Sequence, residues 1–140
     1  MPTPFESAQL ALRLYELRRD PVLREARNWW LFEFHPDSAD EIVAAFLGAD
    51  HHKFRAVVGY WDVAAALVLH GAIDPAIFFD TNPEMLGFYS KVAPYLAAVR
   101  ERMQRPQYLA NVERVVAQWP GAEERMAVLR RSLHARVGKT

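Results

Sequence analysis

The chain has 140 residues, with 17 basic and 17 acidic side chains and 51% hydrophobic residues, a composition typical of a globular domain and too apolar for a disordered one. It contains no cysteine, which excludes disulfide scaffolds, zinc fingers, iron–sulfur clusters and thiol catalysis. A chain of this length buries about 68–70% of its unfolded surface, so its core can stabilise it without cross-links. We expect a single domain over residues 1–140.

The balanced charge hides an uneven distribution along the chain. Residues 1–99 carry 8 basic and 13 acidic side chains, whereas residues 100–140 carry 9 basic and 4 acidic ones. A basic segment can contact nucleic acid or an acidic partner. Here it contains no run of five or six like charges, and Glu123 and Glu124 interrupt it. Contact with the acidic part of the same chain, or of a second copy, is therefore favoured over weak nucleic-acid binding.

The sequence shows no export or membrane signal. Its first residues lack a positive charge ahead of an apolar run, so we expect no secretory signal. The most apolar stretch, residues 56–73, is interrupted by Asp62 and His70 and is shorter than the roughly 20 apolar residues of a membrane span. These features predict a cytoplasmic protein that does not contact the membrane.

Helical periodicity explains almost the whole chain and predicts an all-α bundle of seven or eight helices. In chain order we expect helices at about residues 4–19 and 21–34, a short helix between Ser38 and Gly48, a helix at about 51–70 and one or two helical turns from Pro75. Further helices are expected at about residues 83–103 and 106–119, and between Gly121 and Gly138. The helix near 51–70 is apolar nearly all round, which predicts a buried helix at the centre of the domain.

Capping residues and prolines set the expected helix boundaries. Asp20 and Asp50 precede helical patterns as N-caps, and Ser38 with Glu41 matches a capping box. Pro94 lies inside the pattern of residues 83–103, where proline either kinks a helix or divides it in two.

Asp62 is the most informative residue, because it lies among apolar and aromatic residues in the middle of the central helix. A buried carboxylate must be paired, hydrogen-bonded or protonated. Arg55 lies two turns earlier on the same face, and Gly59 leaves open space between them. One interpretation is a pocket with aromatic walls, formed by Tyr60 and Trp61, in which Arg55 and Asp62 bind a small polar ligand or a partner's side chain.

The alternative interpretation of Asp62 is structural, and we favour it. In this case the carboxylate forms a buried ion pair that fixes how neighbouring helices pack. The candidate partners are Arg24, Arg27 and Arg100.

Two further pairs of adjacent residues are candidates for a site: two tryptophans as a contact surface and two histidines as metal ligands. Trp29 and Trp30 are adjacent, so one ring could cover a second surface, either a partner contact or a second layer within the chain. His51 and His52 follow Asp50, but adjacent helical residues point about 100° apart and no His-x-x-x-His or Glu-x-x-His spacing occurs. We therefore favour an exposed helix start over a metal site.

The middle of the chain contains several short motifs. They are Phe54-Arg55, Val58-Gly59-Tyr60-Trp61-Asp62, Gly71-Ala72-Ile73-Asp74-Pro75 and Val92-Ala93-Pro94-Tyr95-Leu96, followed by Arg100. Over residues 53–102 this segment resembles a bacterial family known only as a domain of unknown function. The chain differs from that family's pattern in having Gly59 where Asn is usual and Asp62 where Glu is usual. The resemblance implies an all-helical fold and no established activity.

No motif specifies a reaction or a cofactor. The sequence contains neither a Gly-x-Ser-x-Gly nucleophile motif nor a glycine-rich phosphate loop, so no cofactor is expected. We expect a non-enzymatic binding or protein-interaction module that associates with a protein partner or with itself. The alternatives are a small metal-dependent or acid/base enzyme at Asp62 and Arg55 or at His51 and His52, and a nucleic-acid binder that uses the basic C-terminal helix.

Overall fold

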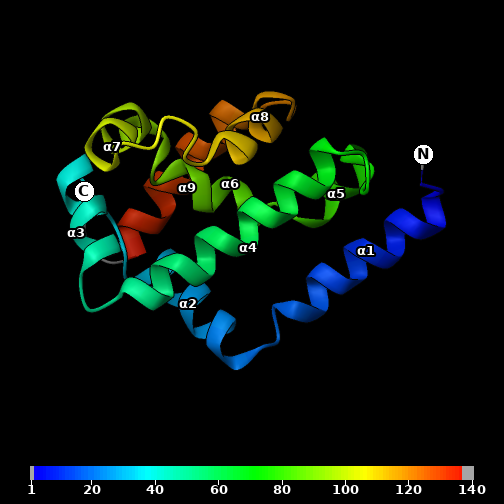
Figure 1. Ribbon diagram of the computed structural model, residues 1–140, viewed down its shortest axis with the longest axis horizontal. Coiled ribbons are helices and arrows are strands. Elements are labelled where there is room, and N and C mark those ends of the chain that lie inside the picture. The colour runs from blue at the N-terminus through cyan, green and yellow to red at the C-terminus, as the bar shows by residue number, and fades with distance from the viewer. Residues whose placement is uncertain (1, 137–140) are drawn as a thin grey trace.

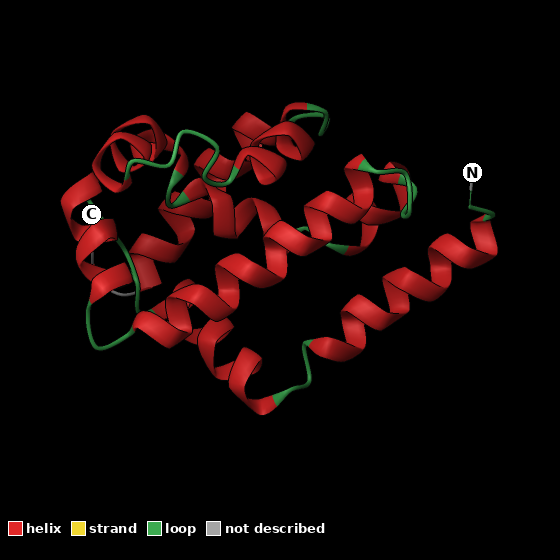
Figure 2. Ribbon diagram, in the orientation of Figure 1, coloured by secondary structure: helices red, strands yellow, loops and turns green. Residues whose placement is uncertain are grey.

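The computed structural model describes residues 2–136, with side chains described through residue 132, and these residues form helices joined by turns (Figures 1 and 2). The described α-helices are α1 (Pro4–Leu17), α2 (Pro21–Phe32), α3 (Ala39–Leu47), α4 (His51–Leu69), α5 (Pro75–Thr81), α6 (Glu84–Ser90), α7 (Leu96–Met103), α8 (Ala110–Ala117) and α9 (Ala122–Arg136), and a short 3₁₀ helix covers Ala93–Tyr95. The predicted all-α fold is confirmed.

Helix α4 is the central element of the fold, as predicted. It packs against α2, α3 and α8, and it crosses the middle of the molecule in Figure 1. Phe54, Val57 and Trp61 on this helix are almost completely buried. The helix is not buried all round, however, because Val63 is exposed.

Most of the predicted caps are present. The Asp20 carboxylate accepts hydrogen bonds from the amides of Val22 and Leu23, and the Ser38 hydroxyl accepts one from the Glu41 amide. Asp50 is the exception, because its side chain caps no amide and lies 3.8 Å from the Lys53 ammonium instead.

The segment around Pro94 is divided rather than kinked. Helix α6 ends at Ser90, the 3₁₀ helix contains Pro94, and α7 begins at Leu96. Proline lacks the amide hydrogen that would continue the helical ladder, which explains the break. The next helix begins at Ala110 rather than at residue 106, because the backbone at Gln104 and Leu109 adopts positive φ angles of 55° and 59°.

Within residues 2–136, no helix has both the length and the apolar character needed to cross a membrane.

Candidate functional site

Asp62 lies on the wall of an open groove between α4 and the segment that connects α7 to α8. The groove has a volume of about 550 Å³. Its lining consists of Val58, Asp62, Arg105, Pro106, Gln107, Tyr108, Leu109, Ala110, Asn111 and Arg114. Asp62 is partly buried, and its carboxylate accepts one long hydrogen bond of 3.4 Å from the Asn111 amide. The carboxylate is therefore accessible to a ligand.

The buried ion pair predicted for Asp62 is not formed. Arg27 binds Glu84 through two hydrogen bonds of 2.6 and 2.8 Å, and Arg100 donates a hydrogen bond of 2.9 Å to Glu113. These arginines are occupied because Glu84 and Glu113 lie closer to them in the fold, which the sequence alone did not reveal. Among the described residues, Asp62 has no cationic partner within ion-pair distance.

Groups of both signs line the Asp62 groove. The Arg105 guanidinium lies 5.9 Å from the centre of the Phe46 ring, and Arg114 is exposed at the opposite end of the lining segment. Burial raises the pKa of Tyr108, so its hydroxyl stays protonated and can donate a hydrogen bond. The groove can therefore bind a polar group through a carboxylate and a guanidinium.

The backbone on one wall of this groove is strained. Leu109 has a φ of 59° and a buried side chain, and the left-handed conformation costs roughly 1–2 kcal/mol for a residue with a Cβ atom. Strained backbone of this kind occurs preferentially at binding and catalytic sites. The strain supports the Asp62 groove as a candidate site.

The four aromatic residues that we predicted to line a site lie in the core. Trp30 and Trp61 are completely buried, and Tyr60 and Trp29 nearly so. The Tyr60 hydroxyl donates to the Leu14 carbonyl at 2.7 Å, and Trp29 stacks on Phe34 with ring centres 4.9 Å apart. The rings of Trp29 and Trp30 both pack within the chain, which agrees with a second layer inside the molecule rather than with a partner contact. These side chains have a structural role and do not form an exposed binding surface.

Arg55 and the histidines do not join the Asp62 groove. Arg55 is exposed on α4 but is not part of the groove lining. The His51 ring nitrogen Nδ1 lies 2.5 Å from the Phe46 carbonyl oxygen, and His52 is exposed. Within the described part of the chain, no cluster of three or more histidine or acidic residues is arranged to hold a metal ion.

Lys91 is a buried cation that the sequence analysis did not identify. Its ammonium donates to the carbonyl oxygens of Trp30, Leu31 and Phe34 at 2.5, 3.0 and 2.7 Å, and it lies 3.3 Å from His35 Nδ1. These carbonyls lie at the C-terminal end of α2, where the helix offers unpaired acceptors and negative potential. Burial lowers the pKa of Lys91 to about 7. Lys91 therefore completes α2 and is a structural group.

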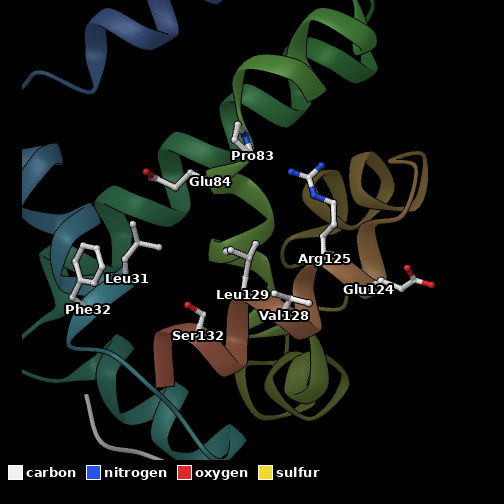
Figure 3. A pocket seen from close by; sticks show the side chains of 10 residues that line it. Leu31, Phe32, Pro83, Glu84, Glu124, Arg125, Val128, Leu129 and Ser132 are labelled. Atoms are coloured by element: carbon white, nitrogen blue, oxygen red, sulfur yellow. The ribbon is translucent and has the colours of Figure 1, made fainter. Parts of the chain in front are cut away.

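A second groove, which the sequence analysis also missed, lies between α2, α6 and α9 (Figure 3). It has a volume of about 600 Å³ and a mostly apolar lining. The lining residues are Leu31, Phe32, Pro83, Glu84, Gly87, Glu124, Arg125, Val128, Leu129 and Ser132. The only sequence signal for it is Gly87 in a helical pattern, because a Cβ atom there would lie 3.6 Å from the Leu31 side chain and narrow the groove.

Helix α1 presents a third surface of interest. It lies at the edge of the molecule in Figure 1 and packs mainly against α5. Its inner side buries Ser7 and Leu14. Its outer side exposes Phe5, Leu12 and Tyr15, which are 70%, 58% and 57% exposed.

Comparison with known proteins identifies one family. Residues 4–119 match a family described as a domain of unknown function, DUF4760, so the match extends from α1 through α8 and ends before α9. No curated protein and no solved structure matches the chain. The match covers the segment 53–102 in which the sequence resembles an uncharacterised family, and the chain therefore belongs to the DUF4760 family of domains of unknown function.

Proposed function

We propose that the protein is a cytoplasmic, non-enzymatic interaction module that associates with a second copy of itself through the outer face of α1. The observation that carries this proposal is the exposed apolar stripe of Phe5, Leu12 and Tyr15 on a helix whose opposite side is already packed. Contiguous exposed apolar side chains are typical of protein-interaction sites.

The spacing of these residues suits helix pairing. Phe5, Ala8, Leu12 and Tyr15 follow one another at steps of three, four and three residues, which places them on one face of the helix. The helix has 14 residues, about 21 Å at 1.5 Å per residue. Two copies related by a two-fold axis would each offer the same stripe to the other. The formal net charge is zero, so no net repulsion opposes the pairing.

Substitution of Leu12 tests this surface. Leu12→Glu places a carboxylate in the centre of the stripe, and we expect it to weaken self-association at least tenfold because the charge must be desolvated. Leu47→Glu is the matched control, since Leu47 is 72% exposed on α3. Sedimentation equilibrium measures both dissociation constants. A contact of about 5.5 kcal/mol would be half-saturated at about 100 µM. The proposal would be contradicted by a wild-type protein that stays monomeric at this concentration. Equal weakening by both substitutions would contradict it too.

A second candidate function is the binding of a small polar ligand in the Asp62 groove. It is favoured by the unpaired Asp62 carboxylate, which shares a groove with Arg105 and Arg114. A free amino acid carries both an ammonium and a carboxylate, and such a molecule complements these charges.

Backbone amide signals of the groove residues report on ligand binding there. Titration with a panel of free amino acids should shift the backbone amide signals of Tyr108 and Asn111 in NMR spectra, and Asp62→Asn should remove the response. Because Asp62 is partly exposed and weakly bonded, this substitution should change the free energy of unfolding by less than about 0.5 kcal/mol. Arg55→Gln is the control and should leave the response intact. Loss of the response in both variants, or no response to any amino acid, would refute this candidate.

A further inference from the structure

The apolar groove between α2, α6 and α9 has the size and lining of a small-molecule site. Leu31 from α2 and Val128 and Leu129 from α9 form its walls (Figure 3), and Gly87 of α6 also lines it. Its volume of about 600 Å³ is within the range of about 300–1,000 Å³ that small-molecule pockets occupy. It is separate from both the outer face of α1 and the Asp62 groove.

The charged side chains around this groove differ in whether they already have an ion-pair partner. Glu84 is already bound by Arg27 through two hydrogen bonds, so its negative charge is compensated. The Glu124 carboxylate points away from the groove in Figure 3. The Arg125 side chain makes no hydrogen bond or ion pair with another described residue, and its guanidinium extends towards Pro83 at one end of the groove. The groove therefore has a positive charge without a partner, the Arg125 guanidinium, at one end.

The apolar lining argues against a peptide as the occupant. An extended or irregular peptide would bring backbone N–H and C=O groups against Leu31, Val128 and Leu129, which offer no hydrogen bonds in return. A hydrocarbon chain has no polar groups to satisfy. Its burial is favourable in proportion to its apolar area.

We propose that this groove binds a free amphipathic carboxylate of the fatty-acid type. The hydrocarbon chain lies between α2 and α9, and the carboxylate lies at the Arg125 guanidinium, which can bind it with two hydrogen bonds. Half of the groove comes from α9, which lies outside the family match at residues 4–119. The site therefore includes residues that the family match does not cover.

Calorimetric titration with hexanoate, octanoate and decanoate, each below its micelle concentration, tests the proposal. Each added methylene should lower the dissociation constant about fourfold, from the usual gain per buried methylene. Decyltrimethylammonium carries a tail that is one carbon longer and a headgroup of the opposite charge, and we expect it to bind at least tenfold more weakly than decanoate. Failure to detect decanoate binding, an affinity that does not depend on chain length, or equal binding of the cation would overturn the proposal.

Two variants separate the head and tail contacts. Arg125→Gln should weaken decanoate at least fivefold and leave decanol binding unchanged, because only the carboxylate uses the guanidinium. Val128→Glu should abolish decanoate binding, whereas Val63→Glu should not. Val63 is the matched control because the two valines are similarly exposed, at 58% for Val63 and 56% for Val128. Arg125 is exposed, so its substitution tests the site even if Val128→Glu impairs folding. Unchanged decanoate binding in Arg125→Gln, or equal loss in both valine variants, would overturn the assignment.

Discussion

Replacing Lys91 by methionine is expected to lower the free energy of unfolding by about 2–3 kcal/mol near neutral pH. Methionine fills a similar volume but cannot donate, so the carbonyls of Trp30, Leu31 and Phe34 lose their shared partner in a place that water does not reach. Urea unfolding monitored by circular dichroism measures the change. Lys53→Met is the matched control, because the Lys53 side chain is 31% exposed and forms only ion pairs of 3.8 Å. An effect of Lys91→Met no larger than that of the control would refute the structural role.

The stability difference between the wild-type protein and Lys91→Met should also depend on pH. Burial lowers the pKa of Lys91 to about 7 in the folded state, against an ordinary value of 10.5. Between these two values the unfolded chain binds more protons than the folded one, so the Lys91 contribution to stability rises with pH. The slope can reach about 1.4 kcal/mol per pH unit. The wild-type advantage over Lys91→Met should therefore grow from pH 7 to pH 9, and a difference that stays flat or falls would contradict the lowered pKa.

Trp30→Ala should be the most damaging single substitution in the core, with a loss of about 3–5 kcal/mol. The Trp30 ring is completely buried and contacts the rings of Phe34, Phe54 and Phe88 at centre distances of 4.9, 5.2 and 4.8 Å. Folded proteins of this kind are stable by about 5–15 kcal/mol, so we expect the variant to lose much of its folded population on warming. Thermal and urea unfolding measure this loss.

A comparison of two phenylalanine variants isolates one hydrogen bond. Trp30 and Trp61 are equally buried, but only Trp30 uses its indole N–H, which donates to the Phe88 carbonyl at 3.2 Å. Trp61 Nε1 has no hydrogen-bond partner among the described residues. Trp30→Phe should therefore cost about 1 kcal/mol more than Trp61→Phe in urea unfolding. Equal losses would mean that the Trp30 hydrogen bond contributes nothing to stability.

The helices were largely predictable because their signals are local. Asp20 and Ser38 cap the helices that follow them, and the apolar pattern of residues 51–70 identified the central helix. The late start of α8 was not predictable, since it depends on Leu109 adopting a left-handed backbone so that its side chain can be buried. Local propensity disfavours that conformation, and only tertiary packing compensates for it.

The candidate sites were predictable only in part. Asp62 was identified because a carboxylate in an apolar helix is conspicuous, but its neighbours in the groove come from residues 105–114, about fifty positions later in the chain. Lys91 was missed because its acceptors are backbone carbonyls, which every residue possesses and no sequence pattern marks. The apolar groove was missed for a related reason, since it is a space left between three helices.

The contact between α6 and α9 bears on where the folding unit ends. The family span stops at residue 119, yet α6 is buried along nearly its whole length and α9 packs against it. A fragment cut at the evolutionary boundary would thus leave one side of an apolar helix uncovered. In relatives that lack an equivalent of α9, we expect polar residues at the positions of Leu31 and Gly87. The folding unit would then end where the family match ends in those relatives, whereas in this chain it also includes α9.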